Sequence, residues 1–141
     1  MTTLPRQVEY GLIALADMHA ANPGQFFAVR GICEEHGIPF DVMSKTMQRL
    51  TRAKILRSIQ GVNGGYQIIR DLSTVSLLEL MEAVVGPVGI VICLKEGKVC
   101  PLEENCNVVS GMSVLNHRIK DVYRSTTILE LIVSEDPALA R

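Results

Sequence analysis

The sequence predicts a mainly α-helical fold that contains one small β-hairpin, and three patterns lead to this prediction. Apolar residues recur at helical spacing along most of the 141-residue chain. Two short stretches rich in β-branched residues, 55–60 and 66–69, flank a glycine-rich tip. Near the C-terminus, apolar residues alternate by four and three, which is the spacing of two helices that pack along each other.

The first 53 residues are expected to form three helices. The first covers 6–20, and the Asn-Pro-Gly sequence at 22–24 is expected to end it. The second covers 28–36 and is followed by Gly37, which suits a helix C-terminus. Asp41 is expected to cap a third helix that runs to Ala53. The residues expected on the inner faces are Val8, Leu12, Leu15, Ala16, His19, Val29, Ile32, Cys33, Met43, Met47 and Leu50.

The outer face of the third helix is expected to be polar and basic. Four long side chains lie there at i, i+3, i+4 and i+7, namely Lys45, Gln48, Arg49 and Arg52. Two helices joined by a short turn, the second basic on its outside, are typical of a helix-turn-helix whose second helix enters the DNA major groove. These four residues are therefore predicted to contact DNA, and the alternative is a basic face that is only solvated.

A hairpin follows this unit directly. Its tip, 61–65, contains Asn63-Gly64-Gly65, which is expected to supply the positive φ angles of a tight turn. Small tip residues also allow the backbone to approach a phosphate or enter the minor groove. The hairpin is predicted to be a wing in which Arg57, Asn63 and Gly64 contact DNA, and the alternative is an ordinary surface hairpin. Residues 1–72 are then a winged helix-turn-helix DNA-binding region.

The charge distribution supports a DNA-binding surface, although the net charge of −1 does not. Residues 45–70 contain six Lys and Arg and no Asp or Glu, so this segment carries +6 and the remainder carries −7. Positive charge concentrated on one element is what phosphate contact requires.

Residues 73–141 are predicted to hold a loop, 86–106, and dimerisation helices. Ser73 or Ser76 is expected to cap a helix that reaches Val85. A long helix is expected from Leu102 or Asn107 to Ser125, followed by a short helix after 127. Its heptad stripe predicts the seam of a two-fold homodimer on a palindromic DNA operator, and the alternative is packing onto its own domain. The stripe consists of Val108, Met112, Leu115, Ile119 and Val122.

Three cysteines lie in the loop at the spacing Cys93-x6-Cys100-x5-Cys106. No signal peptide or membrane span is evident, so a cytoplasmic protein with no membrane partner is expected, in which thiols stay reduced. The spacings are wider than the Cys-x2-Cys of structural zinc and suit an iron–sulfur cluster. Zinc and a redox thiol set stay open, and Cys33 is expected to be a core residue.

The chain resembles a known family over nearly its whole length. The stretches Val8-Glu9-Tyr10 and Arg57–Tyr66, together with the cysteine loop, are similar to the bacterial winged-helix iron–sulfur regulators of the IscR, NsrR and RsrR type. The resemblance implies a homodimeric repressor or activator that senses iron, nitric oxide or redox state through a cluster.

The resemblance also implies a ligand set. The three cysteines match the cluster ligands of the family, but Val109 stands where IscR-like members place a histidine. Glu9, donated by the partner subunit, and His36 match the ligands of RsrR-like members. Oxygen and nitrogen ligands favour a [2Fe–2S] cluster, and a [4Fe–4S] cluster stays open. The alternatives are that Glu9 is a solvated helix-start residue and that His36 lies near a helix C-terminus for its charge.

The predicted function is therefore a dimeric DNA-binding transcription regulator that senses redox, nitric oxide or iron status through an iron–sulfur cluster. The alternative within this fold is a cluster-free repressor that depends on thiols or zinc. A small redox enzyme is not expected, because the sequence contains no nucleotide loop, no Cys-x2-Cys pair and no catalytic dyad.

Overall fold

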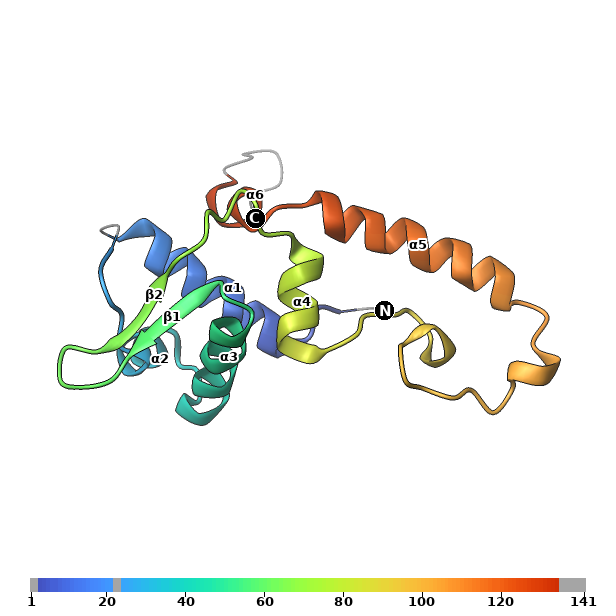
Figure 1. Ribbon diagram of the computed structural model, residues 1–141, viewed down its shortest axis with the longest axis horizontal. Helices are drawn as coiled ribbons and strands as arrows, with labels where there is room; N and C mark the ends of the chain where they lie inside the picture. The colour runs from blue at the N-terminus through green and yellow to red at the C-terminus, as the bar shows by residue number, and fades with distance from the viewer. Residues whose placement is uncertain (1–2, 22–23, 135–141) are drawn as a thin grey trace.

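The computed structural model describes residues 3–21 and 24–134, and it confirms a mainly helical winged-helix fold with a two-stranded hairpin. Two single-turn 3₁₀ helices, η1 (Ile92–Leu94) and η2 (Glu103–Asn105), lie in the loop before the last two helices. In order, the other elements are α1 (Arg6–Ala20), α2 (Val29–His36), α3 (Phe40–Arg52), β1 (Leu56–Ile59), β2 (Gly65–Ile68), α4 (Leu77–Val85), α5 (Val109–Ser125) and α6 (Ile128–Val133) (Figure 1).

One hydrophobic core holds most of these elements together. Leu15 of α1, Met47 of α3 and Leu80 of α4 are fully buried in it. Ile128 at the start of α6 is also fully buried there. Burial of side chains of this size contributes about 1.5–3 kcal/mol each, so α4 and α6 are held firmly on the winged helix.

The buried face of α1 differs in part from the expected one. Val8 and Leu15 are buried as predicted, but His19 is exposed, and the residues that share the buried face are Gly11, Ala14 and Met18. The reason is the position of α3 and α4, because Gly11 lies against side chains of both helices. Hydropathy gives a glycine little weight, whereas close packing of helices favours a small residue at their contact.

The helix ends show which capping predictions hold. Pro39, not Asp41, precedes α3, so the prediction for Asp41 is wrong and its carboxylate lies in the first turn. The Ser76 side chain accepts a hydrogen bond from the Glu79 backbone N–H at 3.1 Å and caps α4 as predicted. Gly37 has the left-handed conformation expected after α2. The predicted end of α1 at 22–24 falls partly on residues outside the described ranges.

The hairpin is tied to the helices by a backbone bridge. β1 and β2 pair antiparallel, from Leu56 opposite Ile68 to Ile59 opposite Gly65. Phe27, just before α2, exchanges two backbone hydrogen bonds with Tyr66 at 2.8 and 2.9 Å. The hairpin therefore continues from the helix-turn-helix as one connected unit, which is the arrangement of a wing.

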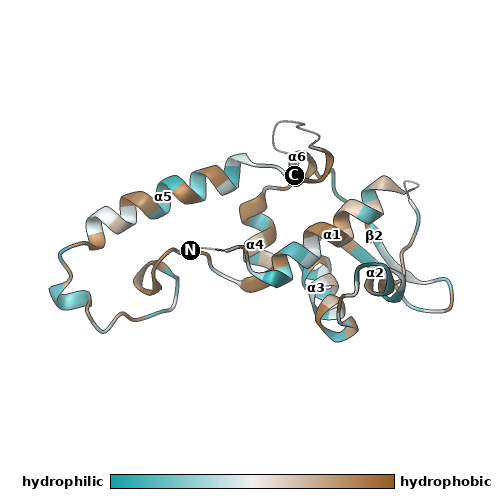
Figure 2. Ribbon diagram, turned by 180° about the vertical axis from the view of Figure 1, so that it is seen from behind, coloured by the Kyte–Doolittle hydropathy of each residue, from teal (hydrophilic) through white to brown (hydrophobic). Residues whose placement is uncertain are grey.

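Helix α5 extends away from the body of the molecule and packs mainly on α4 (Figure 1). It begins at Val109, later than either predicted start, and η2 at 103–105 excludes the earlier start at Leu102. Among its 17 residues only Asn116 is buried, and brown apolar segments run along it in Figure 2. Its C-terminal end is anchored to the body, since the Leu77 N–H donates to the Thr126 carbonyl at 2.8 Å.

Within residues 3–21 and 24–134, no helix combines the length and the apolar character needed to cross a bilayer.

Candidate nucleic-acid interface and metal centre

The outer face of α3 presents three of the four predicted DNA-contact residues. Lys45, Gln48 and Arg52 are exposed, whereas Met43 and Leu50 on the opposite face are fully buried. This division follows from the helical repeat, because residues three and four apart share a face. The same face therefore offers two cations and one amide at the surface.

Arg49 does not lie on that exposed face, so the structure corrects this part of the prediction. Its side chain is half-buried, and Nη1 donates to the Val84 carbonyl of α4 at 2.5 Å and to Gln7 Oε1 of α1 at 3.0 Å. The helical repeat places Arg49 at the edge of the polar face, and the packing of α4 turns that edge inward.

The wing arginine is held in place by two contacts. Arg57 Nε of β1 donates to Gln67 Oε1 of β2 at 2.5 Å, and the Gln67 amide donates in turn to the Gly24 carbonyl at 2.5 Å. The Arg57 guanidinium also lies 5.4 Å from the centroid of the Phe26 ring. Arg57 is exposed, but these contacts hold its cation against Gln67 and the Phe26 ring.

The wing tip is shaped by glycines, of which Gly65 was expected and Gly61 was not. The positive φ angles belong to Gly61 (116°) and Gly65 (145°), so the expectation holds for Gly65 and is wrong for Asn63 and Gly64. A Cβ at Gly64 would clash with the Ile59 carbonyl, so this position needs glycine for space. Asn63 and Val62 are exposed at the tip and free to reach an outside partner.

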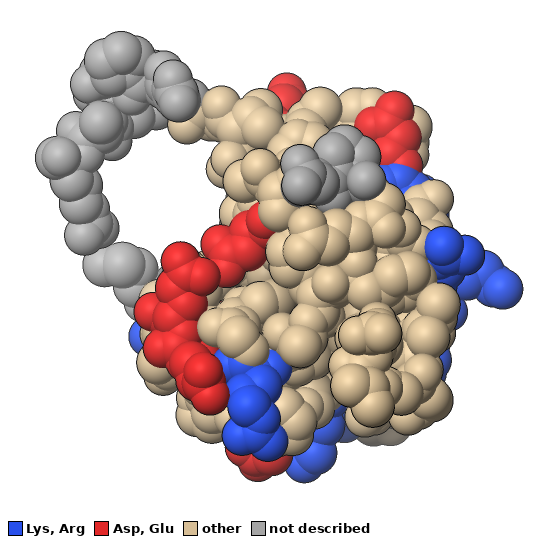
Figure 3. All heavy atoms as spheres, turned by 90° about the vertical axis from the view of Figure 1, so that its left-hand side faces the viewer, with Lys and Arg blue, Asp and Glu red and all other residues tan. Residues whose placement is uncertain are grey.

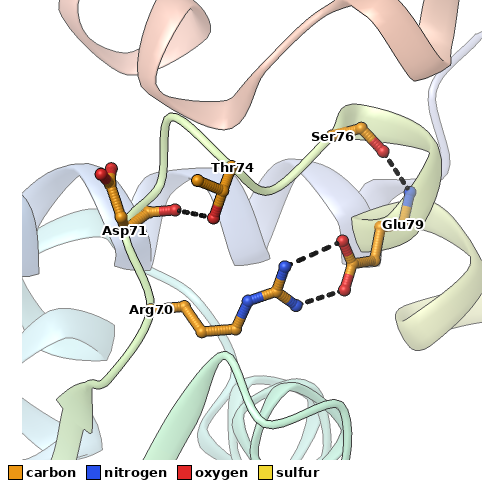
Figure 4. Close-up of polar contacts among 5 residues, drawn as sticks. All are labelled: Arg70, Asp71, Thr74, Ser76 and Glu79. Carbon is orange, nitrogen blue, oxygen red and sulfur yellow. Dashed lines mark hydrogen bonds and ion pairs between the residues drawn. The ribbon is translucent and has the colours of Figure 1, made fainter.

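Arg70, counted in the basic segment, has a structural role. It forms a two-pronged ion pair with Glu79, which joins the end of the hairpin to the first turn of α4 (Figure 4). Thr74 Oγ1 donates to the Asp71 carbonyl at 2.7 Å and shapes the turn between them. The surface charge of this region is therefore smaller than +6. In Figure 3 most acidic atoms form a band on the left of the view, and this band borders a basic group at the lower left.

Lys54 lies between α3 and β1, next to the predicted DNA-contact residues, and the sequence did not single it out. It is exposed, and among residues 3–21 and 24–134 it is the one non-glycine residue with a positive φ, 59°. A second missed feature is the exposed Phe40 ring at the start of α3, with the Arg30 guanidinium 5.1 Å from its centroid. The sequence did contain a clue to this feature, because Phe40 is an aromatic residue at the start of the predicted recognition helix.

The cysteine loop, between α4 and α5, contains three half-buried thiols. Burial raises the pKa of the Cys93 thiol, and the neighbouring Cys100 and Cys106 raise it further. The loop is fastened to α5 by Asn116, whose Oδ1 accepts from the Ile90 N–H at 3.1 Å. Cys33 is separate from this group. It lies on α2 and is buried in the hydrophobic core, as predicted, and this burial raises the pKa of its thiol.

The two other candidate ligands lie on the winged helix. Glu9 of α1 is half-buried and accepts from Arg6 Nη1 at 2.6 Å. His36 Nε2 at the end of α2 lies 2.6 Å from Asp17 Oδ2. Figure 1 places α2 and the cysteine loop at opposite ends of the molecule, so one chain does not bring His36 and the cysteines together.

The chemical type of the donor atoms on this loop fits an iron–sulfur cluster. Three thiols on one loop supply the sulfur that such clusters bind. In the described part of the chain these sulfurs do not all lie within 4.8 Å of one another, whereas ligand atoms of Asp17, Glu35 and His36 do. A cluster spreads its ligands more widely than one ion does, so the loop suits a cluster better than a single closed tetrahedral site.

Comparisons with known proteins agree with this fold. The model of the Rrf2 family, described as "Iron-dependent Transcriptional regulator", matches residues 4–134. A protein of Aquifex aeolicus (strain VF5), named "Putative HTH-type transcriptional regulator", is 28% identical over 134 residues, which are 94% of this chain and 92% of that protein.

Two solved structures share the fold at low sequence identity. CymR (YrzC), described as the global cysteine regulator of B. subtilis, has a TM-score of 0.72 and 19% identity, covering 96% of this chain and 100% of that chain. IscR of T. potens has a TM-score of 0.67 and 16% identity, covering 99% and 93%. The family match extends over almost all of the sequence. The chain therefore belongs to the Rrf2 family and is a DNA-binding transcriptional regulator rather than an enzyme.

Proposed function

We propose that this regulator acts as a homodimer on a palindromic operator and that an iron–sulfur cluster controls its affinity for DNA. The observation that carries the proposal is the gathering of Cys93, Cys100 and Cys106 on one loop between α4 and α5. The description of the matched family as iron-dependent supports the same conclusion. We expect a cytoplasmic location, where reduced thiols remain available to iron.

The non-sulfur ligands come, in this proposal, from a second copy of the chain. Glu9 and His36 both lie on the winged helix. Figure 1 places α2, which ends at His36, far from the cysteine loop, so a second copy of the chain would have to bring His36 to it. Asp17 supports the role of His36, because a carboxylate on one imidazole nitrogen orients the ring and leaves the other nitrogen for metal. When bound, the cluster would supply a redox- and nitric-oxide-sensitive group. The mixed donor set favours [2Fe–2S] over [4Fe–4S].

The apolar stripe on α5 supports the dimer. Val108 just before the helix, Leu115 and Val122 are 55%, 43% and 60% exposed, so their own domain does not cover them. Residues spaced by four and three pack naturally against the same stripe of a second helix. A seam between two α5 helices would fix the distance between the two recognition helices, which a palindromic site requires.

The DNA contacts assigned in this proposal come from α3 and the wing. Lys45, Gln48 and Arg52 on α3 would face base edges and phosphates in the major groove. Arg57, Asn63 and Gly64 would meet the backbone or minor groove. Phosphate contact of this kind makes binding steeply dependent on salt.

Anaerobic purification tests the cluster. We expect a coloured protein containing iron and acid-labile sulfide, and Cys→Ser variants at 93, 100 and 106 should separate the two cluster types. A [4Fe–4S] cluster needs all three thiols, whereas a [2Fe–2S] cluster with Glu9 and His36 leaves one spare. Cys33→Ala is the matched control, because this buried thiol should not affect the cluster. A colourless wild-type protein without iron or sulfide would contradict the proposal.

Mixed dimers test whether two copies share the site. We expect Glu9→Ala and a cluster-deficient Cys→Ser variant each to lack the cluster alone. Co-expressed, they should regain about half of the wild-type iron content in mixed dimers, since each mixed dimer keeps one complete ligand set. No recovery in isolated mixed dimers would show that each chain completes its own site.

A second candidate is a cluster-free regulator that uses the same loop. The Cys93 and Cys100 thiols lie close enough to influence each other, which suits either oxidation to a disulfide or a zinc ion. Iron-free protein whose operator binding changes on thiol oxidation, or which contains zinc by metal analysis, would support this candidate.

A further inference from the structure

Arg49 connects the recognition helix to two other helices. From α3 its Nη1 donates to the Val84 carbonyl of α4 at 2.5 Å and to Gln7 Oε1 of α1 at 3.0 Å. The side chain lies in a crevice between α3 and α4 whose wall includes Glu82 and Gly86. It is half-buried there and turned away from the exposed face that Lys45 occupies.

The end of α4 depends on this contact. The last four carbonyls of a helix have no partner within the helix, and a cation nearby is favourable. Helix α4 has no basic residue in its own last turn. Arg49 supplies both the donor and the charge, so α3 fixes the point at which the cysteine loop begins at Gly86.

Defined contacts also hold the start of α1 and the start of α4. Gln7 lies in the first turn of α1, two residues before Glu9. The first turn of α4 is held to the end of the hairpin by the Arg70–Glu79 ion pair. Helix α4 is thus tied to α3 at one end and to the hairpin at the other, so a displacement at the start of the loop would strain the contact with α3.

We propose that Arg49 is a positioning residue that couples the orientation of α3 to the start of loop 86–106 and to the start of α1. This proposal depends on the proposed function in one respect only, namely that the signal at the loop is the state of an iron–sulfur cluster. Coupling between two sites is reciprocal in free energy, so if the conformation at 84–86 alters DNA affinity, DNA bound at α3 changes the stability of 84–86 by the same amount.

Hydrogen–deuterium exchange of the full-length protein tests this coupling without a cluster. The probe is a duplex selected from a random library, added at saturation to cluster-free protein. In the wild type, we expect DNA to slow exchange at 84–86 and in the first turn of α1. In Arg49→Gln both changes should be lost, while Arg49→Lys, which keeps a cation at the end of α4, should retain part of them. Gln7→Ala should lose only the change in α1.

Lys45→Gln is the control on the same helix, because this exposed cation does not line the crevice and should lower DNA affinity without affecting the exchange changes at saturation. For protein that holds a cluster, operator Kd is measured with the cluster present and after its removal. The difference between the two values should shrink in Arg49→Gln and stay at the wild-type size in Lys45→Gln. Protein that contains no cluster refutes the proposed function and leaves the exchange test of Arg49 intact. Arg49→Gln protein that keeps the full DNA-induced change at 84–86 overturns the proposal.

Discussion

Replacement of Lys54 by glycine should stabilise the fold and weaken DNA binding. The turn after α3 places Lys54 at a φ of 59°, fixed by two backbone bonds: Lys54 N–H to the Thr51 carbonyl at 3.0 Å and Ile55 N–H to the Leu50 carbonyl at 3.1 Å. This is the pattern that usually ends in glycine. The left-handed conformation costs a non-glycine residue about 1–2 kcal/mol. The greater freedom of unfolded glycine opposes the gain by about 0.4–1 kcal/mol. We therefore expect the free energy of unfolding to rise by about 1 kcal/mol.

Denaturant unfolding at matched protein concentration measures this change, with Lys54→Ala as the control that removes the charge but keeps the Cβ. None of the ion pairs among the described residues includes Lys54, so both variants lose an unpaired cation. For one phosphate contact, the slope of log K against log salt should fall by about one in both. Lys54→Gly protein that is no more stable than Lys54→Ala would show that the left-handed conformation of Lys54 costs no stability.

Three further changes test separate parts of the structure. Leu115→Glu places a charge in the α5 stripe and should convert the dimer to monomer in sedimentation, and a variant that stays dimeric rules out the seam. Gly64→Ala should weaken the hairpin by about 1–3 kcal/mol because its Cβ meets the Ile59 carbonyl, whereas Gly31→Ala, with open space in α2, should stabilise by up to about 1 kcal/mol in the same unfolding assay. Hydrogen bonds from the Thr127 N–H and hydroxyl lower the pKa of Glu130, so its contribution to stability is complete above the unfolded value of about 4.3 and is lost as pH falls through the folded pKa. Glu130→Gln should accordingly be less stable than wild type at neutral pH, and the difference should vanish on acidification; a constant difference would contradict the capping role.

Local patterns predicted most of the fold. Helical spacing gave the bounds of α1 and α2 within one residue, and the glycines of 61–65 correctly indicated a hairpin tip. The errors arose where distant elements decide the outcome. Arg49 lies at the edge of a helical face, and only the packing of α4 turns it inward.

The contacts of the candidate site were harder to predict from the sequence than the fold. The His36–Asp17 contact joins residues that are 19 positions apart on different helices, and no local spacing encodes it. The same holds for the Arg57–Gln67–Gly24 connection in the wing. The roles of Cys93, Cys100, Cys106, Glu9 and His36 stay predictions, because a site shared by two copies depends on how they assemble.

The most direct test of the account is the affinity for one operator duplex of a single anaerobic protein sample, measured before and after its cluster is removed. The expected result is a clear change in Kd that is reversed when the cluster is rebuilt and that is absent in a Cys→Ser variant unable to hold it. The same Kd in both states, with cluster content verified by iron and sulfide analysis, would contradict the claim that this loop controls DNA binding.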